Sequence, residues 1–235
     1  MRITGTIMPG TLYIVATPIG NLKDITLRAI ETLKTVDIIA CEDTRHTATL
    51  LKHYDISKPL TSYFEHNKTK KAKKIIDLLK KGKEVALCSD AGTPGISDPG
   101  YRVINDAINE GVEVIPIPGA SAAISALSVS GMPTDKFFFE GFLSSKGAAR
   151  KKRLKEISAL KHTIIIYESP HRILVTLKDM QEVLGDIDLV CAREITKKFE
   201  EIRRSGIGDA ITYFSEHTRK GEFVIIFNPR KKALK

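Results

Sequence analysis

The chain has 235 residues, 42% of them hydrophobic, which is enough for the packed core of one large domain or two small ones. Lys and Arg outnumber Asp and Glu by 37 to 28, and the formal charge of +9 favours a polyanionic partner such as a nucleic acid. The three cysteines lie far apart, which argues against a disulfide framework or a metal site, and no apolar run approaches the roughly 20 residues of a membrane span. We therefore expect a cytoplasmic globular protein with no metal and no membrane contact.

After an N-terminal extension over residues 1–10, short β-branched runs alternate with amphipathic stretches as far as Pro118. This alternation is typical of parallel strands joined by crossover helices. The expected strands cover 12–15, 37–40, 85–88 and 112–115, and the expected helices cover 27–36, 44–53 and 68–81. Residues 11–118 are therefore predicted to form an α/β domain with a mainly parallel sheet.

The rhythm changes after an apolar helix candidate over 120–129, and residues 119–230 are predicted to form a second α/β domain. Its expected strands cover 136–140, 163–167, 189–192, 200–205 and 222–227, and its expected helices cover 148–160 and 170–184. Successive strands late in the chain favour a mixed sheet. Residues 231–235 form a predicted basic tail.

Three short turns rich in Gly and Pro each follow an apolar run, over residues 17–21, 89–100 and 116–122. If the preceding runs are parallel strands, all three turns emerge at one sheet edge, where open α/β sheets bind their ligands. Glycine lets backbone N–H groups approach a ligand, and proline keeps a loop in shape. Three such turns together favour a ligand cradle over ordinary strand-to-helix connections.

Several common binding and catalytic motifs are missing. No Gly-x-Gly-x-x-Gly follows the first strand, and the chain has no P-loop, Gly-x-Ser-x-Gly, His-Glu-x-x-His or Cys-x-x-Cys. These absences disfavour dinucleotide and nucleoside-triphosphate binding by those devices, and they disfavour serine-hydrolase and zinc-enzyme chemistry.

Three polar clusters follow predicted strands, over residues 41–46, 168–172 and 193–198. The first offers two carboxylates and an arginine, although Asp43 or Thr44 could simply cap the next helix. In the second, Ser169 and Pro170 resemble the start of a helix. A structural salt bridge is the alternative for Arg172.

Basic residues gather in two stretches, 68–74 and 146–155, and each lies near aromatic side chains. Lysines of this kind supply salt-dependent affinity for the phosphates of RNA or DNA. Core packing is the favoured alternative for two of the aromatic residues, Phe138 and Phe139.

Five motifs in one order resemble the ribosomal RNA small subunit methyltransferase I family. They are Val15-Ala-Thr-Pro-Ile-Gly-Asn-Leu22, Glu42-Asp-Thr-Arg45, Ser89-Asp-Ala-Gly-Thr-Pro-Gly-Ile-Ser-Asp-Pro-Gly100, Pro118-Gly-Ala-Ser-Ala122 and Tyr167-Glu-Ser-Pro-His-Arg172. The resemblance runs from about Thr11 to Pro229 and implies the two-domain tetrapyrrole-methylase fold of class III methyltransferases. It also implies a homodimer that transfers methyl from S-adenosylmethionine to the 2′-oxygen of a cytidine ribose in the decoding region of 16S ribosomal RNA, within the small ribosomal subunit.

The family resemblance, together with the turns, implies a cofactor site in the cleft between the domains. The expected contacts are Pro18, Gly20, Asp90, Gly92, Thr93, Pro94, Gly95, Ile96, Ser97, Pro118, Gly119, Ser121 and Ala122, with Tyr167 and Ala192 beside the adenine. The wider superfamily carries Gly-Gly-Asp-Pro where this chain has Ala91-Gly-Thr-Pro94, and Gly-Pro-Gly-Asp where it has residues 17–21, so the role of Asp90 stays open.

A ribose hydroxyl needs a nearby base, or a cation that favours its alkoxide. The candidates are Glu168, His171, Arg193, Glu194 and Lys197, with Glu42 and Arg45 also considered. The expected RNA contacts are Arg45, Lys68, Lys70, Lys71, Lys146, Arg150, Lys151, Lys152, Arg153 and Arg172.

Two other function classes remain open from the sequence. A small-molecule methyltransferase of the same fold, acting on a tetrapyrrole or similar acid, would keep the three turns without needing the lysine clusters. A non-enzymatic RNA-binding protein would keep the clusters without needing the turns. The presence of both features favours the RNA-modifying enzyme.

Overall fold

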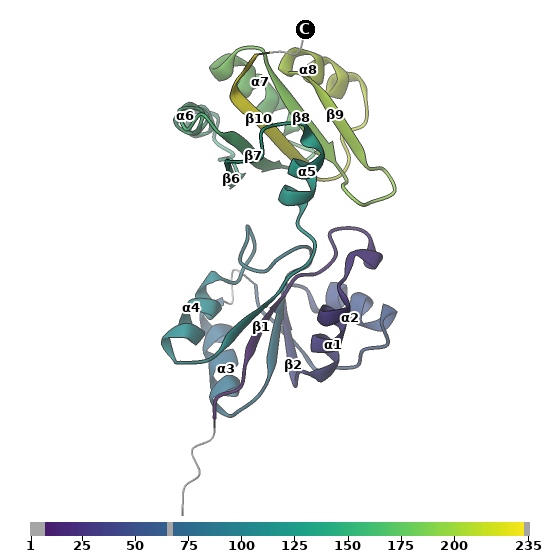
Figure 1. The fold of residues 1–235 in the computed structure, drawn as a ribbon, viewed down its shortest axis with the longest axis vertical. Helices are drawn as coiled ribbons and strands as arrows, with labels where there is room; N and C mark the ends of the chain where they lie inside the picture. Colours follow the sequence, from purple (N-terminus) through teal and green to yellow (C-terminus); the bar gives the residue numbers. More distant parts are fainter. Residues whose placement is uncertain (1–7, 65–67, 233–235) are drawn as a thin grey trace, which may run out of the picture. The chain divides into compact units, whose positions relative to one another are not determined.

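A computed structural model describes residues 8–64 and 68–232 of the chain. The chain divides into two compact units, residues 1–121 and 122–235, and each unit is built on one five-stranded sheet (Figure 1). Residues 1–7 of the predicted extension and 233–235 of the predicted tail lie outside the described residues. Over the described parts, no helix has both the length and the apolar character needed to cross a membrane.

The sheet of unit 1 has the strand order β3-β2-β4-β1-β5, and every neighbouring pair is parallel. Its strands are β1 (Leu12–Val15), β2 (Ile38–Cys41), β3 (Leu60–Ser62), β4 (Val85–Cys88) and β5 (Val114–Ile117). Its helices are η1 (Leu22–Asp24), α1 (Leu27–Thr35), α2 (Thr44–His53), α3 (Lys68–Lys80) and α4 (Tyr101–Asn109). A parallel sheet needs cover on both faces because both faces are apolar.

Two apolar layers provide that cover in unit 1. Leu33 of α1 and Leu51 of α2 pack with Ile39 on one face, whereas Ile75 of α3 and Val103 of α4 pack on the other face. Figure 1 shows α1 and α2 on one side of the sheet and α3 and α4 on the opposite side. The helices therefore leave the carboxyl edge of the strands to the connecting loops.

The sheet of unit 2 is mixed and has the strand order β6-β7-β10-β8-β9. Its strands are β6 (Phe137–Phe142), β7 (Thr163–Glu168), β8 (Ile187–Arg193), β9 (Glu201–Gly206) and β10 (Phe223–Lys232). Its helices are α5 (Ala122–Ser130), α6 (Gly147–Ser158), α7 (Ile173–Leu184) and α8 (Ile207–Glu216). Strands β6 and β7 are parallel, and the other three neighbouring pairs are antiparallel.

The predicted fold class, with a parallel first sheet and a mixed second sheet, is confirmed. The prediction missed β3, α4 and α8, and it began β5 two residues early. Residues 116 and 117 belong to β5 rather than to the third turn, and residues 231 and 232 of the predicted tail extend β10. Helix α8 was missed although Ile207, Ala210 and Phe214, at helical spacing, are all fully buried.

Candidate functional site

The three Gly- and Pro-rich turns converge at the carboxyl edge of the unit 1 sheet. Thr17 and Gly92 exchange two backbone hydrogen bonds, with N···O distances of 2.9 and 3.1 Å. The Thr17 hydroxyl also donates to the Ser89 carbonyl over 3.1 Å. On the other side of β1, a Cβ atom at Gly119 would lie only 2.9 Å from the Ala16 Cβ, so the first and third turns touch. The predicted convergence of these turns is therefore confirmed.

Glycine is required by geometry at two places in this cradle. Gly92 has φ +78°, in the left-handed region, and a Cβ there would lie 3.7 Å from Ile19 and 3.9 Å from the Ala120 carbonyl. Gly100 packs directly on Gly95, because a Cβ at Gly100 would lie 2.7 Å from the Gly95 nitrogen. The turn over residues 89–100 thus folds back on itself and meets both of the other turns.

The residues predicted to bind the cofactor differ in their exposure. The surface ones are Gly20, Ile96, Ser97, Pro118 and Gly119. The half-buried ones are Asp90, Thr93, Gly95, Ser121 and Ala122, and the buried ones are Pro18, Gly92 and Pro94. Ser97 also has φ +61°, an unusual conformation for a residue with a side chain. The cradle therefore presents main chain and small side chains at its surface, together with the 53% exposed side chain of Ile96.

A fourth connection, after β2, joins the same edge. The Asp90 carboxylate accepts a hydrogen bond from the Asp43 backbone N–H over 3.0 Å. Asp43 caps α2 by accepting from the Arg45 backbone N–H over 2.8 Å, so the capping interpretation of the 41–46 cluster is confirmed. Burial and the nearby Asp90 and Asp98 carboxylates raise the pKa of Glu42. The Arg45 side chain pairs with Asp43 and remains 90% exposed.

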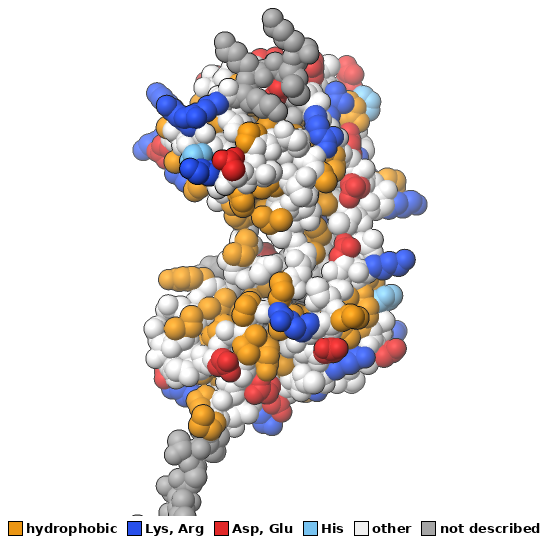
Figure 2. All heavy atoms as spheres, viewed as in Figure 1, with side chains coloured by type: hydrophobic (Ala, Val, Ile, Leu, Met, Phe, Trp, Pro, Cys, Tyr) orange, Lys and Arg blue, Asp and Glu red, His pale blue; other side chains and the backbone are white. Residues whose placement is uncertain are grey.

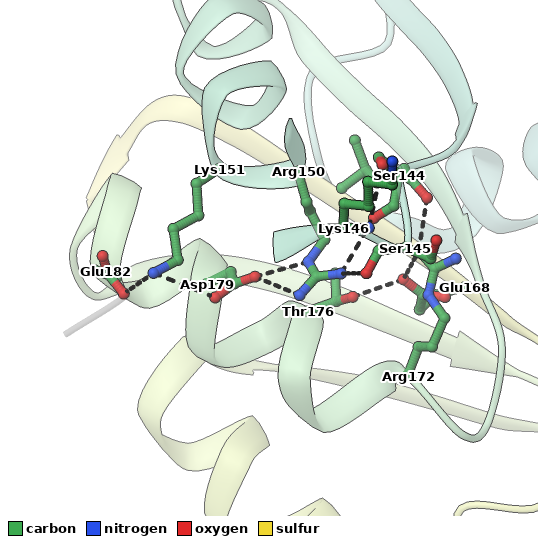
Figure 3. Close-up of polar contacts among 11 residues, drawn as sticks. Ser144, Ser145, Lys146, Arg150, Lys151, Glu168, Arg172, Thr176, Asp179 and Glu182 are labelled. Atoms are coloured by element: carbon green, nitrogen blue, oxygen red, sulfur yellow. Dashed lines mark hydrogen bonds and ion pairs between the residues drawn. The ribbon is translucent and has the colours of Figure 1, made fainter. Parts of the chain in front are cut away.

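In unit 2, Glu168 is the centre of a buried hydrogen-bond network (Figure 3). Its carboxylate is 1% exposed and accepts from the Ser169 backbone N–H over 2.7 Å and from the Thr176 hydroxyl over 2.6 Å. It also accepts from Arg172 over 3.1 Å, and the same guanidinium donates to the Leu143 carbonyl over 2.6 Å. The network ties the ends of β6 and β7 to the start of α7. The structural alternative for Arg172 is confirmed.

Arg150 forms a second buried network nearby (Figure 3). It is 3% exposed, and its guanidinium donates to Asp179 over 2.7 Å and to the carbonyls of Ser144 and Ser145 over 3.1 and 3.2 Å. All of these partners are internal. Arg150 therefore holds α6 against α7 and is not exposed to a nucleic acid, which corrects its place among the expected RNA contacts.

The other expected RNA contacts on α3 and α6 fall into four groups. Lys151 and Arg153 form ion pairs with Glu182 and Glu140, whereas Lys146 and Lys152 are exposed. The Lys71 ammonium is half-buried and lies 3.5 Å from the Thr61 hydroxyl. Lys68 and Lys70 lie in α3, but their side chains are outside the described residues. On the face shown in Figure 2, basic side chains form small groups among acidic ones rather than one continuous field.

Tyr167 and Ala192 lie on one face of the unit 2 sheet. They come from strands β7 and β8, and both pair in register with Val224 of the strand between them. The Tyr167 hydroxyl accepts from the Ala123 backbone N–H over 3.2 Å, and its ring makes an edge contact with Phe139 at 5.0 Å. Phe138 and Phe139 pack against the two apolar layers of unit 2, as expected, whereas Phe142 is 56% exposed.

The last residue of β8 and the connection after it provide three of the proposed catalytic residues. Arg193 is 9% exposed and donates to Glu201 over 3.0 Å. The Lys197 ammonium lies 2.9 Å from both the Glu194 and the Glu222 carboxylates. Burial opposes ionisation of Glu194 and Lys197, but these hydrogen bonds outweigh it: they lower the pKa of Glu194 and raise that of Lys197. Both side chains are therefore charged at neutral pH. His171 is exposed on a different connection.

Comparison with known proteins places these features in a family. Residues 11–211 match the family model of tetrapyrrole (corrin/porphyrin) methylases. The chain is 52% identical over 218 residues to a ribosomal RNA small subunit methyltransferase I of Synechocystis, covering 92% of this chain and 78% of the relative. A Bacillus subtilis protein of the same name is 49% identical over 226 residues, covering 96% and 77%. The chain belongs to the ribosomal RNA small subunit methyltransferase I family.

Solved structures show how widely this family's fold is shared. A diphthine synthase matches with a TM-score of 0.75 at 14% identity, covering 93% of this chain and 90% of that one. Cobalt precorrin-4 methyltransferase, a cobalamin biosynthetic enzyme, matches with a TM-score of 0.71 at 17% identity, covering 97% and 98%. At such low identity the likeness concerns the fold alone.

Three interactions of this family member were missed from its sequence. They are the hydrogen bond from the Asp43 backbone N–H to the Asp90 carboxylate, the Arg150–Asp179 ion pair and the Lys197–Glu222 ion pair. Each joins residues that are 25 to 47 positions apart in the chain, so no local pattern marks them. One usable signal was present, because Arg150 lies at the spacing of buried Leu154 and Ile157 on the inner face of α6.

Proposed function

We propose that this chain transfers a methyl group from S-adenosylmethionine to the 2′-oxygen of a cytidine ribose in the decoding region of 16S ribosomal RNA. The observation that carries the proposal is the convergence of three glycine-containing turns at one sheet edge, in a chain about half identical to proteins named ribosomal RNA small subunit methyltransferase I. We place the reaction in the cytoplasm, on the small ribosomal subunit, and expect the enzyme to act as a homodimer.

The cradle suits an extended small molecule. At Gly92 and Gly119 a side chain would meet neighbouring turns. Because glycine has no side chain, the backbone groups of the cradle can approach a bound ligand closely. We assign the main chain of residues 92–97 to the methionine part and that of 118–122 to the middle of the molecule, with Pro18 and Gly20 beside them. Tyr167 and Ala192 flank the adenine in this assignment. The bound cofactor supplies an activated methyl group on a sulfonium.

Methyl transfer is an in-line displacement, so alignment is the first task of the protein. The attacking hydroxyl must lie opposite the departing sulfur. Alignment that is fixed in advance removes a large part of the activation free energy of a bimolecular reaction. The cross-linked turns are suited to this task, because the Thr17–Gly92 bonds and the Thr17–Ser89 bond fix two of them to each other. Loops without such hydrogen bonds would have to become ordered when the ligand binds, and the loss of conformational entropy would reduce the affinity.

The second task is to favour the ribose alkoxide, and the charged candidates are unequal in this respect. Glu168 already accepts three hydrogen bonds inside the protein, and Arg193 is buried against Glu201. Lys197 is 30% exposed and keeps its positive charge through two carboxylate partners. We therefore assign Lys197 to electrostatic stabilisation of the alkoxide, whose proton passes to solvent water, with Glu194 as its positioning residue and Glu168 and Arg172 as residues that hold the neighbouring backbone.

The deciding experiment supplies labelled S-adenosylmethionine to small ribosomal subunits that lack the modification and, in parallel, to free 16S rRNA and to a tetrapyrrole. Label on the 2′-oxygen of one cytidine supports the proposal and shows whether the assembled particle is needed. Label on the tetrapyrrole alone would favour a small-molecule methyltransferase. Calorimetric titration with S-adenosylmethionine completes the test, because a folded chain that does not bind it is not this enzyme.

A substitution series tests the assignment of Lys197. Lys197→Met should lower turnover while the affinities for S-adenosylmethionine and RNA stay near those of the parent protein, because a transition-state interaction is lost. Lys197→Arg should recover part of the turnover by restoring the charge. A Lys197→Met variant with unchanged turnover would remove the assignment and leave the proposed reaction intact.

A further inference from the structure

The connection between β8 and β9 displays an aromatic side chain to solvent. Phe199 is 65% exposed, although burial of a phenylalanine side chain is worth about 1.5–3 kcal/mol. The Lys198 ammonium lies 5.6 Å from the centre of its ring. Phe199 is only two positions from Lys197, the residue to which we assign alkoxide stabilisation.

This connection is held in one shape rather than left loose. The Thr196 backbone N–H donates to Glu200 over 2.6 Å, and the Lys197 and Glu200 backbone N–H groups close two turns over 2.9 and 3.1 Å. Glu194 and Thr196 have φ +50° and +65°, a left-handed conformation that neither residue favours. Strained backbone of this kind persists only where surrounding contacts enforce it. The exposed ring is therefore pre-positioned.

Several charged residues near the ring bind partners inside the protein. Lys197 engages both Glu194 and Glu222, Arg193 engages Glu201, and Glu200 accepts from a backbone N–H. The 217–222 turn is attached to the same place, because Arg193 donates to the Lys220 carbonyl over 3.1 Å. Lys198, Arg219 and Lys220 are exposed, and none has an ion pair with an acid among the described residues.

We infer that Phe199, Lys198, Arg219 and Lys220 form a contact surface for unpaired RNA, in which the Phe199 ring stacks on one nucleobase and the three cations contact neighbouring phosphates. The inference rests on the proposed function and adds to it a surface that lies outside the two basic stretches 68–74 and 146–155. Stacking platforms beside cations are the common means of holding single strands, because every base offers a π-face and every phosphate a charge.

An exposed aromatic ring could also belong to a protein interface. The cores of protein interfaces are depleted in charged residues, whereas Lys198 lies beside this ring, and the exposed Lys198, Arg219 and Lys220 have no ion pair with an acid among the described residues. Such a surface is complementary to a polyanion. We therefore favour RNA, and association of two copies of the chain through Phe199 becomes an outcome of the test.

The test measures equilibrium binding of the full chain to unmodified small ribosomal subunits. Phe199→Ala should weaken binding by about 5- to 150-fold, the effect of losing one stacked base. Phe199→Leu, which keeps an apolar side chain without a π-face, should also weaken it, and Phe199→Trp should restore it. The salt dependence should be unchanged in all three variants, because no phosphate contact is lost. Phe137→Ala is the matched control, a 43% exposed phenylalanine of the same unit that lies outside the surface.

Two results would overturn the inference. In the first, Phe199→Ala binds the subunit like the parent protein. In the second, Phe199→Ala weakens binding only because the chain no longer associates with a second copy, which a lower sedimentation mass would reveal; Phe199 would then belong to a protein interface. Neither result touches the proposed reaction if the parent protein still methylates the small subunit. Failure of the parent protein to bind or methylate the subunit would instead remove the proposed function itself.

Discussion

At the scale of single residues, Glu168 shows how a conspicuous carboxylate can be structural. Removing it in Glu168→Ala leaves the Arg172 guanidinium with only the Leu143 carbonyl as acceptor and without its ion-pair partner, and it leaves the Thr176 hydroxyl without its acceptor, in a site that is 1% exposed. We expect the free energy of unfolding to fall by about 3 kcal/mol, the lower part of the range for breaking a buried pair, because the Arg172 side chain is 27% exposed. Urea denaturation of unit 2 provides the measurement.

Thr176→Val is the matched control for that prediction. It removes one donor to Glu168 and should cost about 1 kcal/mol, because the carboxylate keeps its two other hydrogen bonds. A Glu168→Gln variant that keeps parental stability and RNA affinity but loses turnover would contradict the structural role and return Glu168 to the catalytic candidates.

The Glu194–Lys197 pair predicts a pH window of stability. The folded-state pKa of Glu194 is lowered from 4.5, so its charge favours folding above pH 4.5, and this contribution is lost as the pH falls through the folded value. The pKa of Lys197 is raised from 10.5, so its contribution is complete below pH 10.5 and is lost as the pH rises through the folded value. The pair should therefore stabilise the fold across the whole interval between 4.5 and 10.5.

Glu194→Gln tests this window in a series of urea denaturations. The parent protein should exceed the variant in unfolding free energy by a constant amount across the interval, and the difference should shrink below pH 4.5. A difference that stays the same in strong acid would show that the glutamine changes packing against Gly221 rather than removing a charge.

At the scale of elements, the contact between the first and third turns gives the sharpest prediction. In Gly119→Ala the new Cβ would lie 2.9 Å from the Ala16 Cβ, and Ala16 follows β1 directly, so the third turn must move. We expect a loss of about 1–3 kcal/mol in unfolding free energy, typical of overpacking, and a fall of about tenfold or more in affinity for S-adenosylmethionine by calorimetry.

Gly147→Ala provides the control for Gly119→Ala. Gly147 begins α6, and a Cβ there would meet only the Arg150 guanidinium at 3.8 Å, an ordinary contact. Its stability and cofactor affinity should match those of the parent protein. If Gly119→Ala also bound the cofactor with parental affinity, the third turn would have no part in the site.

The sequence predicts helices and strands well where one hydrophobic pattern dominates, and poorly where the patterns of a helix and a strand adjoin. Buried strands such as β1 and β4 are continuous apolar runs, and they were found at their observed bounds. Helix α8 contains Gly208 and follows β9 without a loop, so its helical pattern was hidden beside a strand. The turns were predicted from their composition. The hydrogen bond from the Asp43 backbone N–H to Asp90 could not be predicted in this way, because β2 and β4 become neighbours only in the folded sheet.

Tertiary contacts that no local pattern marks also explain why some residues expected to contact RNA are paired inside the protein. A run of basic residues indicates charge but not which charges find acidic partners in the folded chain. Arg150 and Arg153 belong to the densest run, yet they bind Asp179 and Glu140 from other elements. Lys198 lies in a stretch of mixed charge, yet it has no acidic partner within the described parts of the chain, because its neighbours bind each other. The sequence therefore predicts a basic protein, and the tertiary pairing decides which part of its surface is basic.

At the scale of the whole molecule, the question is whether RNA responds to the net charge of +9 or to particular unpaired cations. Two triple variants with the same change in net charge separate these cases. The first converts Lys198, Arg219 and Lys220 to Gln. The second converts Lys80, Lys83 and Arg102, which pair with Glu110, Asp37 and Asp106, to Gln.

We expect the first triple variant to reduce the slope of log affinity against log salt by about 2–3, because each phosphate contact contributes roughly 0.7–0.9. The second should leave the slope almost unchanged, since its cations are already neutralised by carboxylates at 2.6–3.7 Å. Binding of small ribosomal subunits, measured from low to moderate salt, is the readout. Equal slopes for the two variants would mean that the RNA responds to the overall field of the molecule, and the contact surface around Phe199 would then contribute stacking without phosphate contacts.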